Sequence, residues 1–189
     1  MPVEPYEDER IERLRDTDAF RYCSGEELRG FLSPAPDWRV ADLGSGVGLF
    51  TDELAPVTGT VYAVDLRSGL HTTYQAEGLP ENVRPVTADF AALPFPDNHL
   101  DGAISMRTFH HGFVDALEEV SRVLRPGGRL VIMDWSATGA GDREGKMQDH
   151  YVTLAEAQES LLEAGFAIPE ARERRETFIV VGKRRSTTH

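Results

Sequence analysis

From Trp38 onward, short apolar runs alternate with longer segments whose apolar residues lie three and four positions apart. The short runs predict buried strands, and the three-and-four spacing predicts amphipathic helices. The stripe formed by Val114, Leu117, Val120 and Val123 is the clearest helical pattern. We therefore expect strands at 39–43, 60–66, 83–88, 99–105 and 129–134, helices at 48–57, 68–77, 113–124 and 153–164, and a final hairpin of 166–171 with 177–181.

The alternation of strands and helices predicts the fold class, because parallel strands are joined by right-handed helical crossovers. We expect an α/β fold: a Rossmann-like, doubly wound, seven-stranded sheet, mostly parallel, with a C-terminal antiparallel hairpin strand. Pro126, Gly127 and Gly128 should end the helix at 124, and Gly165 should end the helix at 153–164. Ligands bind such sheets beyond the carboxyl ends of the strands, so the chemistry is expected there.

The first 37 residues are more polar and have a helical pattern. Ser24 and Glu27 have the spacing of a capping box, so a helix should begin after Ser24 and stop before Pro34. We expect three parts: an N-terminal helical extension at 1–37 that forms a lid or packing segment, the main domain at 38–185, and a disordered tail at 186–189.

Charge and composition exclude several classes of function. The net charge is −12, whereas a surface that tracks nucleic acid needs clustered Lys and Arg, so no nucleic-acid partner is expected. Cys23 is the single cysteine, and no Cys/His cluster has the spacing of zinc ligands, so we expect neither a disulfide nor a metal. No apolar run approaches the ~18 residues of a membrane span. The expected protein is cytoplasmic, and a monomer or homodimer.

A glycine-rich loop joins the first predicted strand to the first predicted helix. It runs from Asp42 to Gly48, and its glycines at 44, 46 and 48 permit positive φ angles and close approach of a ligand. Asp65 ends the second strand, where a carboxylate can accept hydrogen bonds from both ribose hydroxyls of an adenosine. Asp89 follows the third strand and can reach the edge of an adenine. Three acids after three successive strands predict a nucleoside cofactor.

The loop also distinguishes between nucleoside cofactors. Dinucleotide-binding loops have the pattern G-x-G-x-x-G, whereas this chain has G-x-G-x-G. The carboxylate of Asp42 would repel a pyrophosphate but would attract a sulfonium and an ammonium group. Both features favour S-adenosylmethionine over NAD. An NAD-linked reductase stays an alternative that a binding titration can test.

Four segments together resemble the successive motifs of class I S-adenosylmethionine-dependent methyltransferases. They are Asp42-Leu-Gly-Ser-Gly-Val-Gly48, Val64-Asp-Leu66, Ala88-Asp-Phe90 and Leu124-Arg-Pro-Gly-Gly-Arg-Leu130. The stretches 93–101 and 105–111 are typical of the type 11 subgroup, which includes the ubiquinone/menaquinone-biosynthesis methyltransferases. The resemblance covers residues 38–183, and it implies S-adenosylmethionine as cofactor and methyl transfer as activity.

The resemblance further implies a role for each residue at a matching position of the cofactor site. The methionine portion would be held, or its loop shaped, by Asp42, Gly44, Ser45, Gly46 and Gly48. Asp65 would hold the ribose, Leu66 would lie against the adenine, and Asp89 would pair with the adenine amino group beside Phe90. Met106 and Arg107 would border the methyl-donor end.

The acceptor side is less constrained. His110 and His111 follow the fourth strand and are candidate catalytic residues, with helix capping or packing as the alternative. Trp135 could wall the acceptor site. The N/D-P-P-Y/F motif of amino-methyltransferases is missing after the fourth strand, and the short segment at 136–150 disfavours a bulky prenylated quinone, so we expect a small-molecule acceptor. The competing hypothesis is a methyltransferase-like protein that binds the cofactor without turnover and acts through a protein partner.

Overall fold

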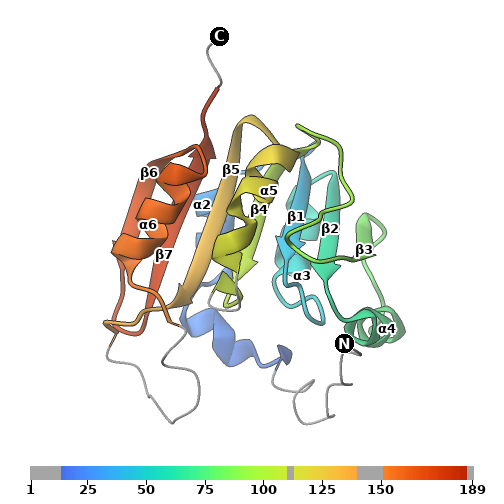
Figure 1. Cartoon of the computed structure of the whole chain (residues 1–189). Coiled ribbons are helices and arrows are strands. Elements are labelled where there is room, and N and C mark those ends of the chain that lie inside the picture. Colours follow the sequence, from blue (N-terminus) through green and yellow to red (C-terminus); the bar gives the residue numbers. More distant parts are fainter. Residues whose placement is uncertain (1–13, 110–112, 140–150, 187–189) are drawn as a thin grey trace.

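The computed structural model describes residues 14–109, 113–139 and 151–186, and its centre is a seven-stranded sheet (Figure 1). The strands, in sheet order, are β3 (Val83–Thr87), β2 (Thr60–Asp65), β1 (Arg39–Leu43), β4 (Leu100–Met106), β5 (Leu124–Trp135), β7 (Thr177–Arg184) and β6 (Phe166–Glu173). β7 is antiparallel to both of its neighbours, and the other neighbouring pairs are parallel. The predicted fold class is confirmed.

Helices cover both faces of the sheet. The helical elements are η1 (Thr17–Arg21), α2 (Gly25–Leu32), α3 (Thr51–Leu54), η2 (Ala55–Val57), α4 (Ser68–Glu77), η4 (Phe113–Ala116), α5 (Leu117–Val123) and α6 (Leu154–Glu163). Successive side chains of a strand point to opposite faces, so Val40 belongs to the buried cluster that includes residues of α2 and α3, and Ala41 to the cluster that includes residues of α5 and α6. The parallel strands all end at one edge of the sheet, beside which η1 lies (Figure 1).

Two predicted helices are shorter than expected. The helix predicted at 48–57 begins at Thr51 and gives way to a 3-10 turn at Ala55, because Gly48 has a positive φ and Pro56 lacks an N–H. The helix predicted at 113–124 consists of η4 followed by α5.

The strand predicted at 129–134 begins earlier, at Leu124. Arg125 precedes a proline, which disfavours helical backbone, and Leu124 is already extended and pairs with Leu100. The 126–128 stretch therefore lies within β5 instead of forming a separate helix terminator, and a register shift between Leu100 and Gly102 accommodates it. Gly165 adopts the predicted left-handed conformation after α6, with φ 87°.

The described part of the N-terminal segment packs on the sheet. The predicted capping box is present: the Ser24 hydroxyl accepts the Glu27 N–H at 3.1 Å, and the Glu27 carboxylate accepts the Ser24 N–H at 3.2 Å. Leu28 and Leu32 of α2 are fully buried beside Cys23, in the same cluster as Val40. Cys23 is itself fully buried, and this burial raises the pKa of its thiol to about 12, so it stays a protonated core residue.

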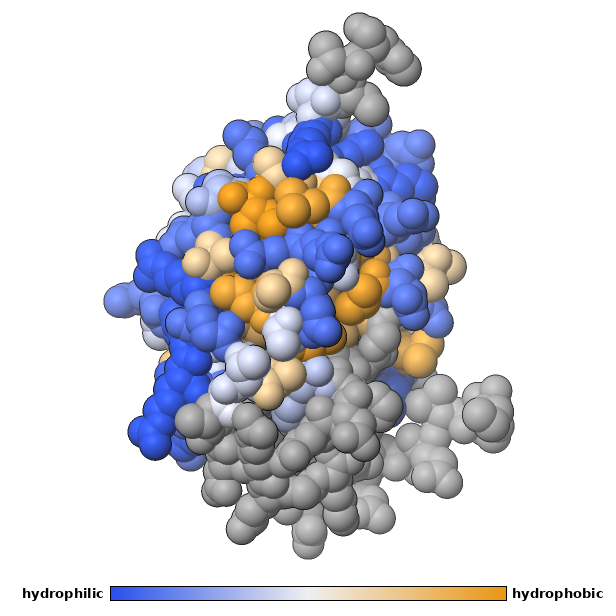
Figure 2. All heavy atoms as spheres, turned by 60° about the vertical axis from the view of Figure 1, so that its left-hand side comes forward, coloured by the Kyte–Doolittle hydropathy of each residue, from blue (hydrophilic) through white to orange (hydrophobic). Residues whose placement is uncertain are grey.

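The outer strand β6 has a polar, interrupted edge. Pro169 removes one backbone donor, and Glu170 and Arg172 form a salt bridge at 2.5 Å. Such features discourage another chain from pairing with an open strand. Figure 2 views the molecule from the side of β6 and α6, where hydrophilic residues surround several apolar spots.

Candidate functional site

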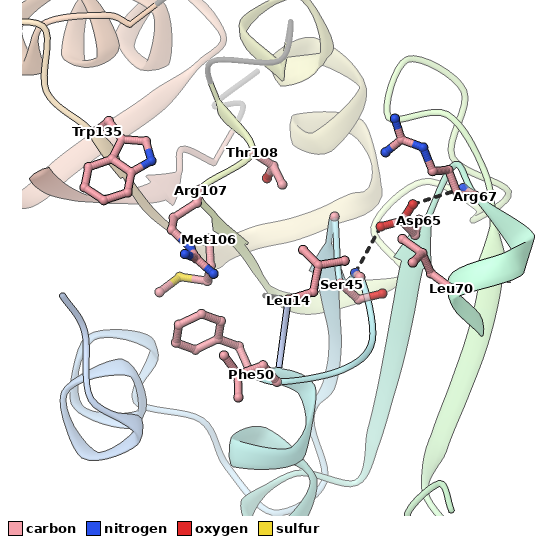
Figure 3. Close-up of a pocket in the computed structure, with 13 residues that line it drawn as sticks. Leu14, Ser45, Phe50, Asp65, Arg67, Leu70, Met106, Arg107, Thr108 and Trp135 are labelled. Atoms are coloured by element: carbon pink, nitrogen blue, oxygen red, sulfur yellow. Dashed lines mark hydrogen bonds between the residues drawn. The ribbon is translucent and has the colours of Figure 1, made fainter. Parts of the chain in front are cut away.

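A cavity of about 320 Å³ lies beside the glycine loop, at the carboxyl ends of the parallel strands (Figure 3). Its walls come from the N-terminal segment, the loop after β1, the residues that follow β2 and β4, and the end of β5. The lining residues are Leu14, Gly44, Ser45, Gly46, Leu49, Phe50, Asp65, Arg67, Leu70, Met106, Arg107, Thr108 and Trp135. The structure thus places a cavity where the strand alternation predicts ligand binding.

Hydrogen bonds to β2 hold the glycine loop. The N–H groups of Gly44 and Ser45 donate to the Val64 carbonyl at 2.8 and 3.0 Å, and the Gly46 N–H donates to an Asp65 carboxylate oxygen at 3.0 Å. Gly44 has φ 83°, and a Cβ there would lie 2.3 Å from the Thr108 side chain, so only glycine fits. The Ser45 hydroxyl is buried, and no described residue gives it a hydrogen-bond partner. That hydroxyl can serve a ligand in the cavity.

Asp65 links the loop to the start of α4. Besides the Gly46 N–H, its carboxylate accepts the Arg67 N–H at 3.0 Å, and the residue is 8% exposed. An ionised carboxylate can accept about four hydrogen bonds, so two backbone donors leave capacity for two more. The position and spare capacity of Asp65 fit a ligand that presents paired hydroxyls, as a ribose does.

Asp42 lies behind the loop and does not line the cavity. It is 2% exposed, and its carboxylate accepts the Thr51 hydroxyl at 2.6 Å. Burial raises the pKa of Asp42 to about 7, and the negative charges of Asp65 and Asp52 add to this, while the Thr51 hydrogen bond opposes it. A cation in the cavity would favour the ionised form of this carboxyl group.

The opposite end of the cavity is formed by residues after β4 and at the end of β5. Arg107 has φ 62°, and its N–H donates to the Met133 carbonyl at 2.7 Å. Thr108 donates its hydroxyl hydrogen to the Leu43 carbonyl at 3.0 Å and lies 2.7 Å from the Ser105 hydroxyl. Burial lowers the pKa of the Arg107 guanidinium, which nonetheless keeps its charge at neutral pH.

Several predicted site residues lie outside the lining. Leu66 is 51% exposed, and Asp89 is exposed and accepts the Ala91 N–H at 2.9 Å. Phe90 packs edge-on against Phe113, with ring centroids 5.3 Å apart. Gly48 and Asp42 also lie outside the lining. Their cofactor roles stay predictions.

Other predictions lie outside the described residues. His110 and His111 belong to this group, as do most of the segment at 136–150 and most of the tail at 186–189. Within 14–109, 113–139 and 151–186, no group of three or more His, Cys, Asp or Glu side chains is placed to hold a metal ion. In the same ranges, no helix has both the length and the apolar content to cross a membrane.

About half of the lining residues were not predicted from the sequence. The missed residues are Leu14, Leu49, Phe50, Arg67, Leu70 and Thr108. Leu49, Phe50, Arg67 and Leu70 closely follow the predicted loop and Asp65, so proximity along the chain could have indicated them. Leu14 has no such signal, because only the tertiary fold brings it within 3.7 Å of a Cβ built on Gly46.

The central part of the chain matches a known family. Residues 41–132 match the family model described as a methyltransferase domain. The chain is 37% identical over 114 residues to the ubiquinone/menaquinone biosynthesis C-methyltransferase UbiE of Ectopseudomonas mendocina, and 37% identical over 107 residues to the demethylmenaquinone methyltransferase of Corynebacterium kroppenstedtii. These matches cover 55% and 56% of this chain and 44% and 45% of the relatives. The chain therefore spans less than half the length of the curated relatives it matches.

A solved structure is similar over nearly the whole chain. It is the crystal structure of a SAM-dependent methyltransferase from Aquifex aeolicus, with 25% sequence identity and a TM-score of 0.81. The match covers 95% of this chain and 99% of the Aquifex chain. The structural likeness thus extends well beyond residues 41–132.

Proposed function

Because this chain belongs to the class I S-adenosylmethionine-dependent methyltransferases, we propose that it transfers a methyl group from S-adenosylmethionine to a small-molecule acceptor. S-adenosylmethionine is the cofactor of this family. The observation that carries the proposal is the two-ended cavity, with a glycine loop and Asp65 at one end and Met106, Arg107 and Trp135 at the other. The first end suits a nucleoside, and the second end is left for an acceptor.

Specific residues support the donor end of this site. Asp65 has acceptor capacity for ribose hydroxyls, and the unpartnered Ser45 hydroxyl can bond the amino-acid portion. The buried Asp42 carboxylate adds negative potential behind the loop, which favours a sulfonium and an ammonium group. We therefore keep Asp42, Gly44, Ser45, Gly46 and Asp65 as the proposed donor-binding set.

When bound, the cofactor supplies an activated methyl group. The acceptor atom would take this methyl group from the cofactor's sulfur and release a proton where it carries one. The chain contributes orientation and exclusion of water, through the walls formed by Phe50, Met106 and Trp135. His110 and His111 stay the candidates for accepting a released proton.

The curated relatives narrow the acceptor only to a class. Their names place them in ubiquinone and menaquinone biosynthesis, but the matches cover less than half of each relative. We propose a small molecule without extending their acceptors to this chain. Cytoplasmic localisation and a monomeric or homodimeric state stay predictions from the sequence.

Calorimetric titration with S-adenosylhomocysteine, followed by assay of labelled methyl transfer to small-molecule acceptors, tests the proposal. We expect binding of S-adenosylhomocysteine, no comparable binding of NAD, and label in an acceptor. Binding of NAD with no binding of S-adenosylhomocysteine would contradict it. Binding with no turnover across carboxylic, phenolic and amine acceptors would instead support the cofactor-binding protein that acts through a partner, an alternative that the family matches do not favour.

A further inference from the structure

Among the described residues, the acceptor end of the cavity is lined by one positively charged side chain, that of Arg107. Of the charged residues in the described lining, Asp65 ends β2 and Arg67 follows it, whereas Arg107 follows β4 and lies at the other end, near Trp135 (Figure 3). We propose that Arg107 selects the acceptor, which is a planar aromatic or conjugated acid bound with its carboxylate on the Arg107 guanidinium. This inference rests on the proposed function and names its substrate class.

The backbone around Arg107 is fixed from both sides. Its own N–H is bonded to the Met133 carbonyl of β5, and the next residue, Thr108, is bonded to the Leu43 carbonyl of β1. Arg107 adopts a left-handed φ of 62°, a backbone conformation that is unfavourable for a non-glycine residue. Such strain persists where the surrounding structure imposes it, and it is typical of residues placed for function. The backbone from which the Arg107 side chain projects is therefore fixed before any ligand binds.

The surroundings of the guanidinium are largely apolar and aromatic. Figure 3 shows it turned toward Met106 and Phe50, with the Trp135 indole on the same side of the cavity. A second layer supports these walls. Phe20 packs edge-on against Phe50 at 5.6 Å, and Tyr22 packs against Trp135 at 4.8 Å. Flat apolar walls around a cation suit a ligand with a planar apolar body and an anionic end.

One donor of the Arg107 guanidinium has no hydrogen-bond partner within the described chain. Its Nε is buried without a hydrogen-bond partner, while Asp134, Asp16 and Tyr22 act on the guanidinium electrostatically. A guanidinium presents a planar fork of N–H donors that matches a carboxylate bidentately, and this pairing strengthens where water is excluded. A neutral carbonyl group could accept one of these hydrogen bonds, but it would supply neither the negative charge nor the second oxygen of a carboxylate.

A competing assignment gives Arg107 to the carboxylate of the cofactor's own methionine portion. The two assignments differ in which ligand loses affinity when the guanidinium is removed. The probes are benzoate and its neutral isostere benzamide, added to the protein saturated with S-adenosylhomocysteine. The two tryptophans provide reporters: the Trp135 indole lines the cavity, whereas Trp38 lies just before β1 and stacks with Arg125 at 5.5 Å, away from the lining.

The experiment follows both indole N–H resonances by NMR during each titration. We expect benzoate to shift Trp135 and not Trp38, with an affinity about tenfold above that of benzamide. Arg107→Gln should remove this preference and change S-adenosylhomocysteine affinity by no more than about threefold. Arg107→Lys should keep part of the preference, because it retains a charge without the fork. Arg185→Gln, an exposed arginine remote from the lining, is the matched control and should behave as the parent protein.

Three outcomes would overturn the inference. Equal affinity for benzoate and benzamide would mean that the acceptor end does not select an anion. Equal shifts of both indole resonances would mean nonspecific surface binding. Loss of S-adenosylhomocysteine affinity in Arg107→Gln, with benzoate binding retained, would show that the guanidinium binds the cofactor and not the acceptor. Failure of the parent protein to bind S-adenosylhomocysteine at all is a separate result, which would overturn the proposed function instead.

Discussion

The ring of Tyr74 occupies the space in front of Gly48, so that a Cβ on this glycine would lie 2.1 Å from the ring's Cζ. Tyr74 is fully buried, and its hydroxyl donates a hydrogen bond to Asp52 of α3. The third glycine of the loop is thus required by the packing of α4 against the loop. Its spacing resembles a cofactor motif, but its Cα faces a tyrosine, and the residue does not line the cavity.

Gly48→Ala should therefore destabilise the fold strongly. The new methyl group would displace the Tyr74 ring, and φ at this position is +88°, so we expect the free energy of unfolding to fall by roughly 2–4 kcal/mol. Urea unfolding measures this loss. Tyr74→Leu in the same chain should recover part of it, because the clash is relieved while the backbone strain stays. If the effects of the two substitutions on the free energy of unfolding are simply additive, the contact with Tyr74 is not what requires a glycine at position 48.

Asp65→Asn should weaken S-adenosylhomocysteine binding by about tenfold or more, since an amide lacks the charge and half of the acceptor capacity of the carboxylate. The same carboxylate accepts the Gly46 and Arg67 N–H groups, so a modest fall in unfolding temperature should accompany the loss. Calorimetry and thermal unfolding measure the two effects. Glu163→Gln on the exposed face of α6 is the control and should change neither. An unchanged dissociation constant in Asp65→Asn would refute the ribose assignment.

The strands and helices could be predicted from the sequence because the spacing of apolar residues along the chain reflects local secondary structure. Ser68–Glu77 was predicted with its observed bounds. The predicted helix end at Leu124 was wrong because this residue continues the apolar spacing of the helix before it, yet its backbone is extended and pairs with Leu100. Motif residues next to the loop were predicted for the same local reason. Leu14 was not, because only the folded chain brings it to the cavity.

Asp42→Asn should stabilise the protein, and more so at high pH. The folded-state pKa of Asp42 is raised from 3.8 to about 7, so between these values the folded chain binds a proton that the unfolded chain releases. Stability from this group is therefore lost as pH rises through that window. An asparagine can still accept the Thr51 hydroxyl and carries no charge to bury.

We expect a gain of roughly 2–4 kcal/mol at pH 8, because three pKa units correspond to about 4 kcal/mol, and a smaller gain at pH 5. Urea unfolding of both proteins at the two pH values gives the comparison. An equal effect of the substitution at pH 5 and pH 8 would show that Asp42 does not titrate between them. The same substitution should weaken S-adenosylmethionine binding, since it removes the negative potential behind the loop.

Arg174 ties the N-terminal segment to the turn between β6 and β7. Its guanidinium donates to the Tyr22 carbonyl and, at 2.8 Å, to the Glu27 carboxylate. Tyr22 in turn packs against Trp135 of the cavity. Removing this arginine should therefore let residues 14–22 leave the cavity edge more often, while the sheet and the glycine loop keep their structure.

Trypsin cleavage after Arg15 and Arg21, followed by mass spectrometry under native conditions, measures this opening. We expect Arg174→Ala to speed cleavage about fivefold, because partly exposed charge-assisted bonds contribute about 1 kcal/mol. Arg185→Ala also deletes one arginine, but Arg185 does not connect the N-terminal segment to the β6–β7 turn. The cleavage rate of this variant should therefore match that of the parent protein. S-adenosylhomocysteine should slow cleavage in all three proteins, because Leu14 lines the cavity. Equal rates in Arg174→Ala and the parent would show that other contacts hold the segment, with the Tyr22 and Glu27 bonds adding little.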